Sequence, residues 1–145
     1  MKKILILLLF ICAVHSSFAV QKLTNPTDTI VAGSIQKNYP GGFESFNSFV
    51  KKKVRPPTIA FEKHKTGTSY VSFIIEPDGS TSHVYTILAA GNGMDEETIR
   101  AISFIKNWSP SLVDNKPVRA FCRLGIKFSA DFSKMEMWVE TQLLD

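Results

Sequence analysis

The sequence lacks a hydrophobic run long enough to cross a membrane. Its longest unbroken apolar stretch, Ile4–Val14, has eleven residues, whereas a membrane-spanning helix needs about 20. Two lysines precede this stretch, and the small residues Ser17 and Ala19 follow it. This order is typical of a cleavable secretory signal peptide. We therefore expect residues 1–19 to be removed and the mature chain to be exported without a membrane span.

Cysteine is scarce as well. Cys12 lies inside the expected signal peptide, and Ile11 before it is larger than the residue that usually precedes a lipidated cysteine, which argues against a lipoprotein. Cys122 would be the only cysteine of the mature chain, so no intramolecular disulfide can form. The fold must therefore depend on a hydrophobic core, which a single domain of this length can supply.

Neither sign of charge dominates. The chain carries 17 basic and 13 acidic residues, and loss of the two signal-peptide lysines lowers its net charge from +4 to about +2. This balance favours neither a nucleic-acid partner nor strong attraction to a membrane surface.

Motifs that carry chemistry are also missing. No CxxC, HxxxH or GxSxG pattern occurs, and His64 and His83 have no sequence context of a metal ligand or a general base. Asp78 begins an Asp-x-Ser-x-Ser pattern, but a calcium loop needs glycine at its sixth position and glutamate at its twelfth. This chain has His83 and Ala89 there. We expect no catalytic residue, no metal site and no cofactor, and a small hydrolase or metalloprotein is a poorly supported alternative.

Two amphipathic helices are predicted. Apolar residues recur at helical spacing from Phe43 to Val54, lysines precede the end of this segment, and Pro56 and Pro57 stop it. A second helix begins with the acidic residues after Met94, where the helix dipole favours negative charge. Its apolar face is predicted to run as far as Trp108.

Three strands are predicted beside them. The apolar run from Gly67 ends at Pro77-Asp78-Gly79, a tight reversal that leads into a second strand at about residues 83–88 and so predicts a β-hairpin. Val118–Phe128 alternates between an apolar and a basic face. Cys122 belongs to the apolar face, which predicts a buried, unreactive thiol. A short strand is also possible at Thr29–Ala32.

The order helix, strand, strand, helix, strand predicts an α+β fold. We expect a small three-stranded antiparallel sheet with two helices packed on one face and with at least one open edge. The predicted organisation is a signal peptide at 1–19, a leader or linker at 20–38, a folded domain at 39–128 and a C-terminal extension at 129–145. The extension fits neither a strand nor a helix well.

These signals together resemble the TonB C-terminal domain, the periplasmic end of an energy transducer that works outer-membrane transporters. The resemblance covers about residues 39–128. It rests on "YPGG", a helix that ends in "RPP", a glycine twelve residues before the glycine of "PDG", and then "GMDEETIRAI", "NWSP", "NKPVRA" and "IKF". "YPGG" before the first helix is similar to the variant found in Bacteroidetes.

The resemblance implies a non-enzymatic, periplasmic binding module. Such a domain takes up an extended segment of a transporter, the TonB box, as an added strand against its last strand, and backbone hydrogen bonds supply affinity. In the family, a Tyr-Pro pair after the first helix also lies near the partner, and here Arg55 and Pro56 stand at that place. The implied partner-binding residues are Val118, Arg119, Ala120, Phe121, Cys122, Arg123, Leu124, Gly125, Ile126, Lys127, Phe128, Arg55 and Pro56.

The sequence departs from a force-transmitting family member in two ways. It shows neither an inner-membrane helix nor a long proline-rich spacer, so we do not expect the chain alone to transmit force. Asp28–Val31 itself resembles a TonB box, and either this segment or the extension could cover the sheet edge. The alternative function is therefore a structural or oligomerising module whose edge pairs with its own ends or with a second copy in a homodimer.

Overall fold

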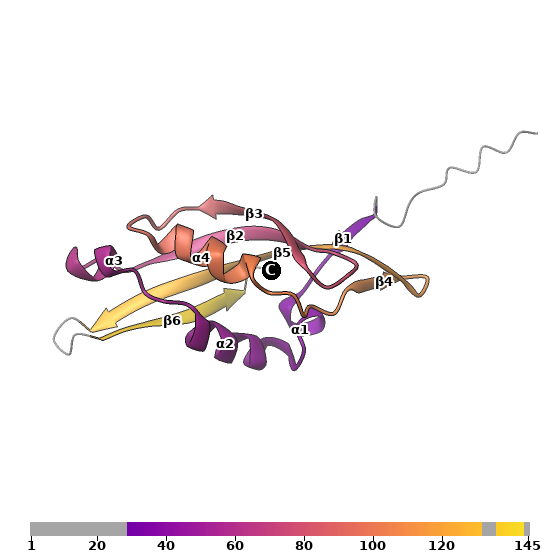
Figure 1. Ribbon diagram of the computed structural model, residues 1–145, viewed down its shortest axis with the longest axis horizontal. Helices are drawn as coiled ribbons and strands as arrows, with labels where there is room; N and C mark the ends of the chain where they lie inside the picture. The colour runs from indigo at the N-terminus through magenta and orange to yellow at the C-terminus, as the bar shows by residue number, and fades with distance from the viewer. Residues whose placement is uncertain (1–28, 132–135, 144–145) are drawn as a thin grey trace, which may run out of the picture.

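The structure is a computed structural model and describes residues 29–131 and 136–143. Its elements are β1 (Ile30–Ala32), α1 (Ile35–Asn38), α2 (Gly42–Lys53), α3 (Thr58–Glu62), β2 (Gly67–Ile75), β3 (Thr81–Leu88), α4 (Met94–Ser103), β4 (Ser111–Val113), β5 (Lys116–Asp131) and β6 (Glu136–Leu143). Figure 1 shows the long strand β5 in the middle of a sheet, with α4 in front of the central strands and α2 beside β6.

The predicted α+β class is confirmed, but the sheet is larger than expected. The antiparallel set β3-β2-β5 forms its centre, as the sequence predicts. Within the described residues, however, the sheet has six strands, because β1, β4 and β6 also pair with β5. Two of these, β1 and β6, come from segments on either side of the predicted 39–128 domain, so the packed unit extends beyond those bounds.

The hydrophobic core lies between the sheet and the two longer helices. Phe46 and Val50 of α2, with Ile102 of α4, are completely buried against the inner faces of β2 and β5. Lysines in the last turn of α2 and acidic residues in the first turn of α4 match the helix dipoles. Both predicted helices are thus confirmed and cover one face of the sheet.

Trp108 occupies a different place from the one predicted. Helix α4 ends at Ser103, so Trp108 lies in the following segment rather than on the helix face. Its ring still packs on the sheet, with its centroid 5.4 Å from that of Phe73. The indole N–H donates a hydrogen bond to the Thr81 hydroxyl over 2.8 Å. This partner explains how a polar aromatic ring can be buried outside a regular helix.

The β2–β3 connection is a tight turn held by Asp78. Asp78 accepts hydrogen bonds from the backbone N–H and the hydroxyl of Ser80, at 2.9 and 2.6 Å. The Ser80 hydroxyl is the main reason why the pKa of Asp78 lies below its usual value. Gly79 adopts a φ of +77°, which glycine accepts at little cost. The hairpin prediction is confirmed.

Gly79→Ala is expected to lower the free energy of unfolding by about 3 kcal/mol. An alanine would be strained at this φ, and its Cβ would lie 2.5 Å from the carbonyl oxygen of Trp108. Urea unfolding measures the loss. Gly91→Ala is the matched control, because Gly91 has a φ of +73° but no heavy atom within 4 Å of an added Cβ. The control should lose only about 1 kcal/mol, and equal losses would contradict the contact with Trp108.

Candidate functional site: the outer edge of β5

The N-terminal half of β5 is covered by β1. The two strands are parallel, with Ile30 opposite Arg119 and Ala32 opposite Phe121. Beyond the strand, the Gly33 N–H donates a hydrogen bond to the Phe121 carbonyl over 2.8 Å. Because backbone groups alternate along a strand, the Val31 N–H also points toward β5, whereas the Ala32 N–H points away from it.

The C-terminal half of β5 is covered by β6. These strands are antiparallel and in register from Leu124 opposite Leu143 to Asp131 opposite Glu136. Val139 is buried in the core, and the Thr141 N–H donates to the side-chain oxygen of Asn47 on α2 over 3.2 Å.

The expectation that residues 129–145 fit no regular element is therefore wrong. Residues 129–131 continue β5, and residues 136–143 form β6. The alternation of Met137, Val139, Thr141 and Leu143 with polar or charged neighbours, broken only by Trp138, was the signal available in the sequence. Both internal candidates for the sheet edge thus lie on that edge, one at each end. Among the described residues, β1, β3, β4 and β6 each pair with a single strand, and β3 lies at the edge of the sheet on the β2 side.

The two faces of β5 are those that the alternation predicts. All six apolar residues of the inner face are buried, and they are Val118, Ala120, Cys122, Leu124, Ile126 and Phe128. On the outer face, Phe121 is 42% exposed, and Arg123 and Lys127 are exposed. Gly125 is buried there, because the Tyr70 ring lies over it and an added Cβ would come within 2.8 Å of that ring.

Arg119 is already engaged on the outer face. Its guanidinium group forms an ion pair with Glu76 over 3.0 Å, and both side chains are about one-fifth exposed. Partial burial favours a raised pKa for Glu76, but hydrogen bonds from Ser82 and Arg119 outweigh it and keep the pKa low. Arg123 and Lys127 are thus the exposed cations of the predicted basic face, and Lys127 lies opposite Glu140 in the β6 register.

A hollow of about 260 Å³ lies where β1 ends and β6 ends. Gly33 and Leu143 border it, and Cys122 and Arg123 form part of its wall. Gly33 passes so close to Cys122 that an added Cβ would lie within 2.4 Å of the sulfur. Burial raises the pKa of the Cys122 thiol to about 12, as expected for an unreactive core cysteine.

Arg55 and Pro56 belong to a different part of the molecule. The Arg55 N–H donates to a carboxylate oxygen of Glu97 on α4 over 2.7 Å. Burial favours a higher pKa for Glu97, but the hydrogen bonds from Arg100 and from the Arg55 backbone lower it. The structure therefore brings Arg55 together with α4 and separates it from the predicted strand site on β5.

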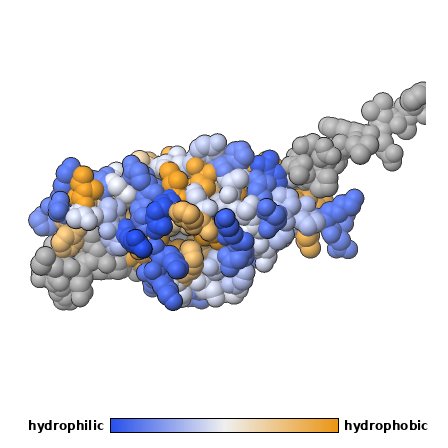
Figure 2. Space-filling view, in the orientation of Figure 1, coloured by the Kyte–Doolittle hydropathy of each residue, from blue (hydrophilic) through white to orange (hydrophobic). Residues whose placement is uncertain are grey.

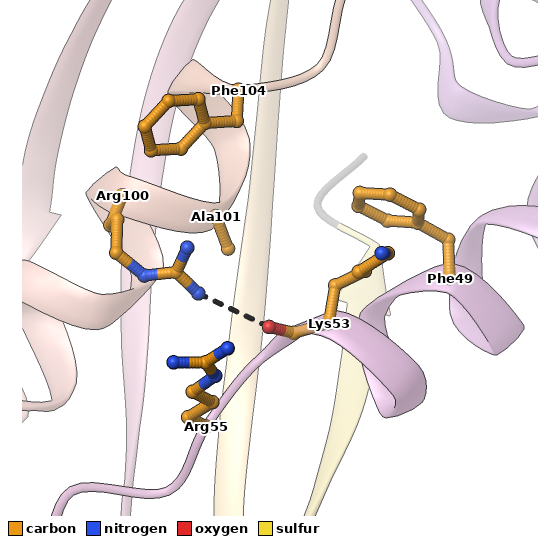
Figure 3. A pocket seen from close by; sticks show the side chains of 6 residues that line it. All are labelled: Phe49, Lys53, Arg55, Arg100, Ala101 and Phe104. Atoms are coloured by element: carbon orange, nitrogen blue, oxygen red, sulfur yellow. Dashed lines mark hydrogen bonds between the residues drawn. The ribbon is translucent and has the colours of Figure 1, made fainter.

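Sequence reasoning missed a pocket of about 340 Å³ beside Arg55. Figure 3 shows its lining, which comes from the C-terminal half of α2, the loop after it, the second half of α4 and the residue that follows α4. The six residues are Phe49, Lys53, Arg55, Arg100, Ala101 and Phe104. Among these six, only Arg55 was predicted to face a partner. The pocket forms where residues of two helices that are far apart in the sequence meet, so no local pattern could predict it.

The comparison with protein families identifies the chain. The family model for the C-terminal part of the Gram-negative bacterial TonB protein matches residues 54–130, which is more than half of the sequence. The chain therefore belongs to the TonB C-terminal domain family. Domains of this family act in the periplasm and are associated with TonB-dependent transport. No curated protein and no solved structure matches the chain.

Within residues 29–131 and 136–143, no helix combines the length and the apolar composition that a membrane crossing requires. No group of three or more His, Cys, Asp or Glu side chains in the same ranges could hold a metal ion.

Proposed function

We propose that this domain binds an extended, TonB-box-like segment of an outer-membrane transporter, or of a similar periplasmic partner, as a strand along β5 in the place of β1. The observation that carries the proposal is β1 itself. A leader segment that resembles a TonB box lies parallel to Arg119–Phe121 with strand register. The edge is thus able to accept a short extended segment, and backbone hydrogen bonds would supply its affinity.

The small number of contacts that β1 makes favours its replacement by a partner segment. Strand β1 is three residues long, and its Ile30 side chain is 51% exposed. The net contribution of a backbone hydrogen bond is only about 1 kcal/mol, so a few of them hold β1 modestly. By contrast, β6 pairs over eight positions and buries Val139. The proposed binding edge is therefore Val118–Arg123, while Leu124–Phe128 stays paired with β6.

Chemistry on the outer face supports an acidic residue in the partner. Arg123 lies just beyond the end of β1, and Phe121 offers exposed apolar surface beside it. An added strand would run next to both side chains. On the same face, Glu76 already neutralises the charge of Arg119.

The test is a titration of residues 20–145 with an extended TonB-box-like peptide, followed by backbone amide NMR shifts. Val31→Pro removes an N–H that points toward β5 and should release β1. We expect its affinity for the peptide to rise roughly tenfold, because the peptide no longer competes with β1. Ala32→Pro is the matched control, since its lost N–H points away from β5.

A second variant tests the edge from the other side. The backbone N–H of Arg123 points to the same side of β5 as that of Phe121, because backbone groups alternate along a strand. Arg123→Pro removes this N–H and should abolish the peptide-induced shifts at residues 118–123. Unchanged affinity in a folded Arg123→Pro protein would refute strand addition.

A second function is favoured by one observation. Both ends of the described chain lie on the β5 edge, as in a structural module that covers its own edge. If no peptide shifts occur in the wild-type protein or in Val31→Pro, this second function takes first place. Sedimentation at increasing concentration then separates a self-covered monomer from a homodimer.

A further inference from the structure

The pocket between α2 and α4 combines an apolar floor with a cationic rim. Ala101 is almost completely buried at its base, and Phe49 closes one side of it. Phe104 stands at the rim with 69% of its surface exposed. Figure 2 shows strongly hydrophilic side chains next to hydrophobic ones on this face of the molecule.

The three cations at the rim are not equally neutralised. Arg100 forms an ion pair with Glu97 at 2.6 Å and donates a hydrogen bond to the Lys53 carbonyl over 3.1 Å. Within the described residues, the side chains of Lys53 and Arg55 form no ion pair. Arg55 interacts electrostatically with Glu97, the carboxylate that already pairs with Arg100. The rim therefore carries more positive than negative charge.

The arrangement of the two arginines adds to this imbalance. Figure 3 shows the guanidinium groups of Arg55 and Arg100 directed toward the same space, below the Phe104 ring. Like charges at short range repel, and an anion between them relieves the repulsion. The Arg100 guanidinium carbon also lies 6.0 Å from the centroid of Phe104, so one arginine joins the charged and the aromatic parts of the pocket.

We propose that this pocket binds an acidic peptide segment in which an aspartate or glutamate is adjacent to an aromatic or large apolar residue. The carboxylate bonds to Lys53 and Arg55, and its neighbour packs on Phe49 and Phe104. Carboxylates form strong, charge-assisted hydrogen bonds with guanidinium groups. A volume of about 340 Å³ suits a pair of side chains. This site is separate from β5 and does not rest on strand addition.

Three capped dipeptides test the chemistry of the ligand. Acetyl-Phe-Asp-amide is titrated into residues 20–145, with acetyl-Phe-Asn-amide and acetyl-Gly-Asp-amide as comparisons that lack the carboxylate or the aromatic ring. We expect saturable NMR shifts at Arg55 and Arg100–Phe104 in the millimolar range. Each comparison should bind roughly tenfold more weakly. Equal binding of all three peptides would overturn the proposal.

Two charge-matched double variants test the place. Lys53→Gln with Arg55→Gln removes the two cations of the rim, and Lys51→Gln with Lys52→Gln removes two exposed cations of the same helix that do not line the pocket. The first pair should abolish the shifts and the second should preserve them. If both double variants lost the shifts equally, the binding would depend on the overall charge of the protein and not on this pocket, and the proposal would be wrong. Binding to phosphatidylglycerol vesicles without binding to any peptide would also overturn the proposal, in favour of a membrane surface.

Discussion

Labelling of the Cys122 thiol is expected to become roughly fiftyfold faster at pH 8 when β1 is released by Val31→Pro. Gly33 lies directly over the sulfur and follows β1 in the chain. Release of β1 should therefore uncover Cys122 while the β2–β5 ladder remains intact. The measurement is the rate of reaction with a chromogenic disulfide reagent in the protein without residues 1–19.

The size of this effect follows from the pKa. Burial raises the pKa of Cys122 from 9.0 to about 12, so at pH 8 the folded protein holds roughly one thousandth of the thiolate of an exposed thiol. The thiolate is the reactive form. A lower pKa also makes the thiolate less nucleophilic. This offsets part of the gain in thiolate and leaves a rate increase of roughly fiftyfold.

Two controls separate local opening from unfolding. Ala32→Pro should react at the wild-type rate, because its missing N–H points away from β5. Gly33→Ala should also react faster, since its Cβ cannot fit within 2.4 Å of the sulfur and the segment must move. Both faster variants should keep their amide protection on β2. If Val31→Pro and Ala32→Pro react at equal rates, β1 does not cover Cys122 and the proposed exchange of strands loses its physical basis.

Phe46→Ala is expected to lower the free energy of unfolding by about 4 kcal/mol. The Phe46 ring is completely buried. Its centroid lies 5.0 Å from that of Tyr39, in an edge-on contact, and 5.6 Å from that of Trp108. Truncation leaves a cavity and removes both aromatic contacts, which contribute beyond the buried area. Urea or thermal unfolding measures the loss.

Phe104→Ala is the control for this prediction. It removes the same side chain from a site that is 69% exposed, and exposed substitutions change stability by about 0.5 kcal/mol or less. A small loss for Phe46→Ala would mean that α2 does not close the core. The same Phe104→Ala protein should bind the acidic dipeptide more weakly, so one variant separates binding from stability.

The two proposed sites divide the surface of the domain. The β5 edge would recognise an extended backbone, whereas the pocket between α2 and α4 would recognise side chains. We expect variants to affect them independently, because β1 contributes no residue to the pocket lining and neither Lys53 nor Arg55 belongs to the paired edge. A partner that used both would bind more tightly than either segment alone.

Local patterns in the sequence determined the centre of this fold. Helical spacing and terminal charges predicted α2 and the start of α4, and the Pro-Asp-Gly reversal predicted the β2–β3 hairpin. Strict alternation predicted both faces of β5, including the buried Cys122. Each of these signals depends on hydrophobic periodicity, on residues at helix ends or on turn-forming residues within about fifteen positions. No contact between distant segments was therefore needed to interpret them.

Only the tertiary structure decided what surrounds that centre. The five-residue helix α3 carries too few apolar positions for a periodic signal, and the short strand β1 exists by pairing with Arg119–Phe121. The C-terminal strand β6 likewise depends on its register with β5. The pocket joins Lys53 and Arg55 to Arg100 across more than forty residues. The sequence by itself thus determined the family and the two faces of β5, whereas long-range packing decided that the chain covers the edge of this strand with its own segments.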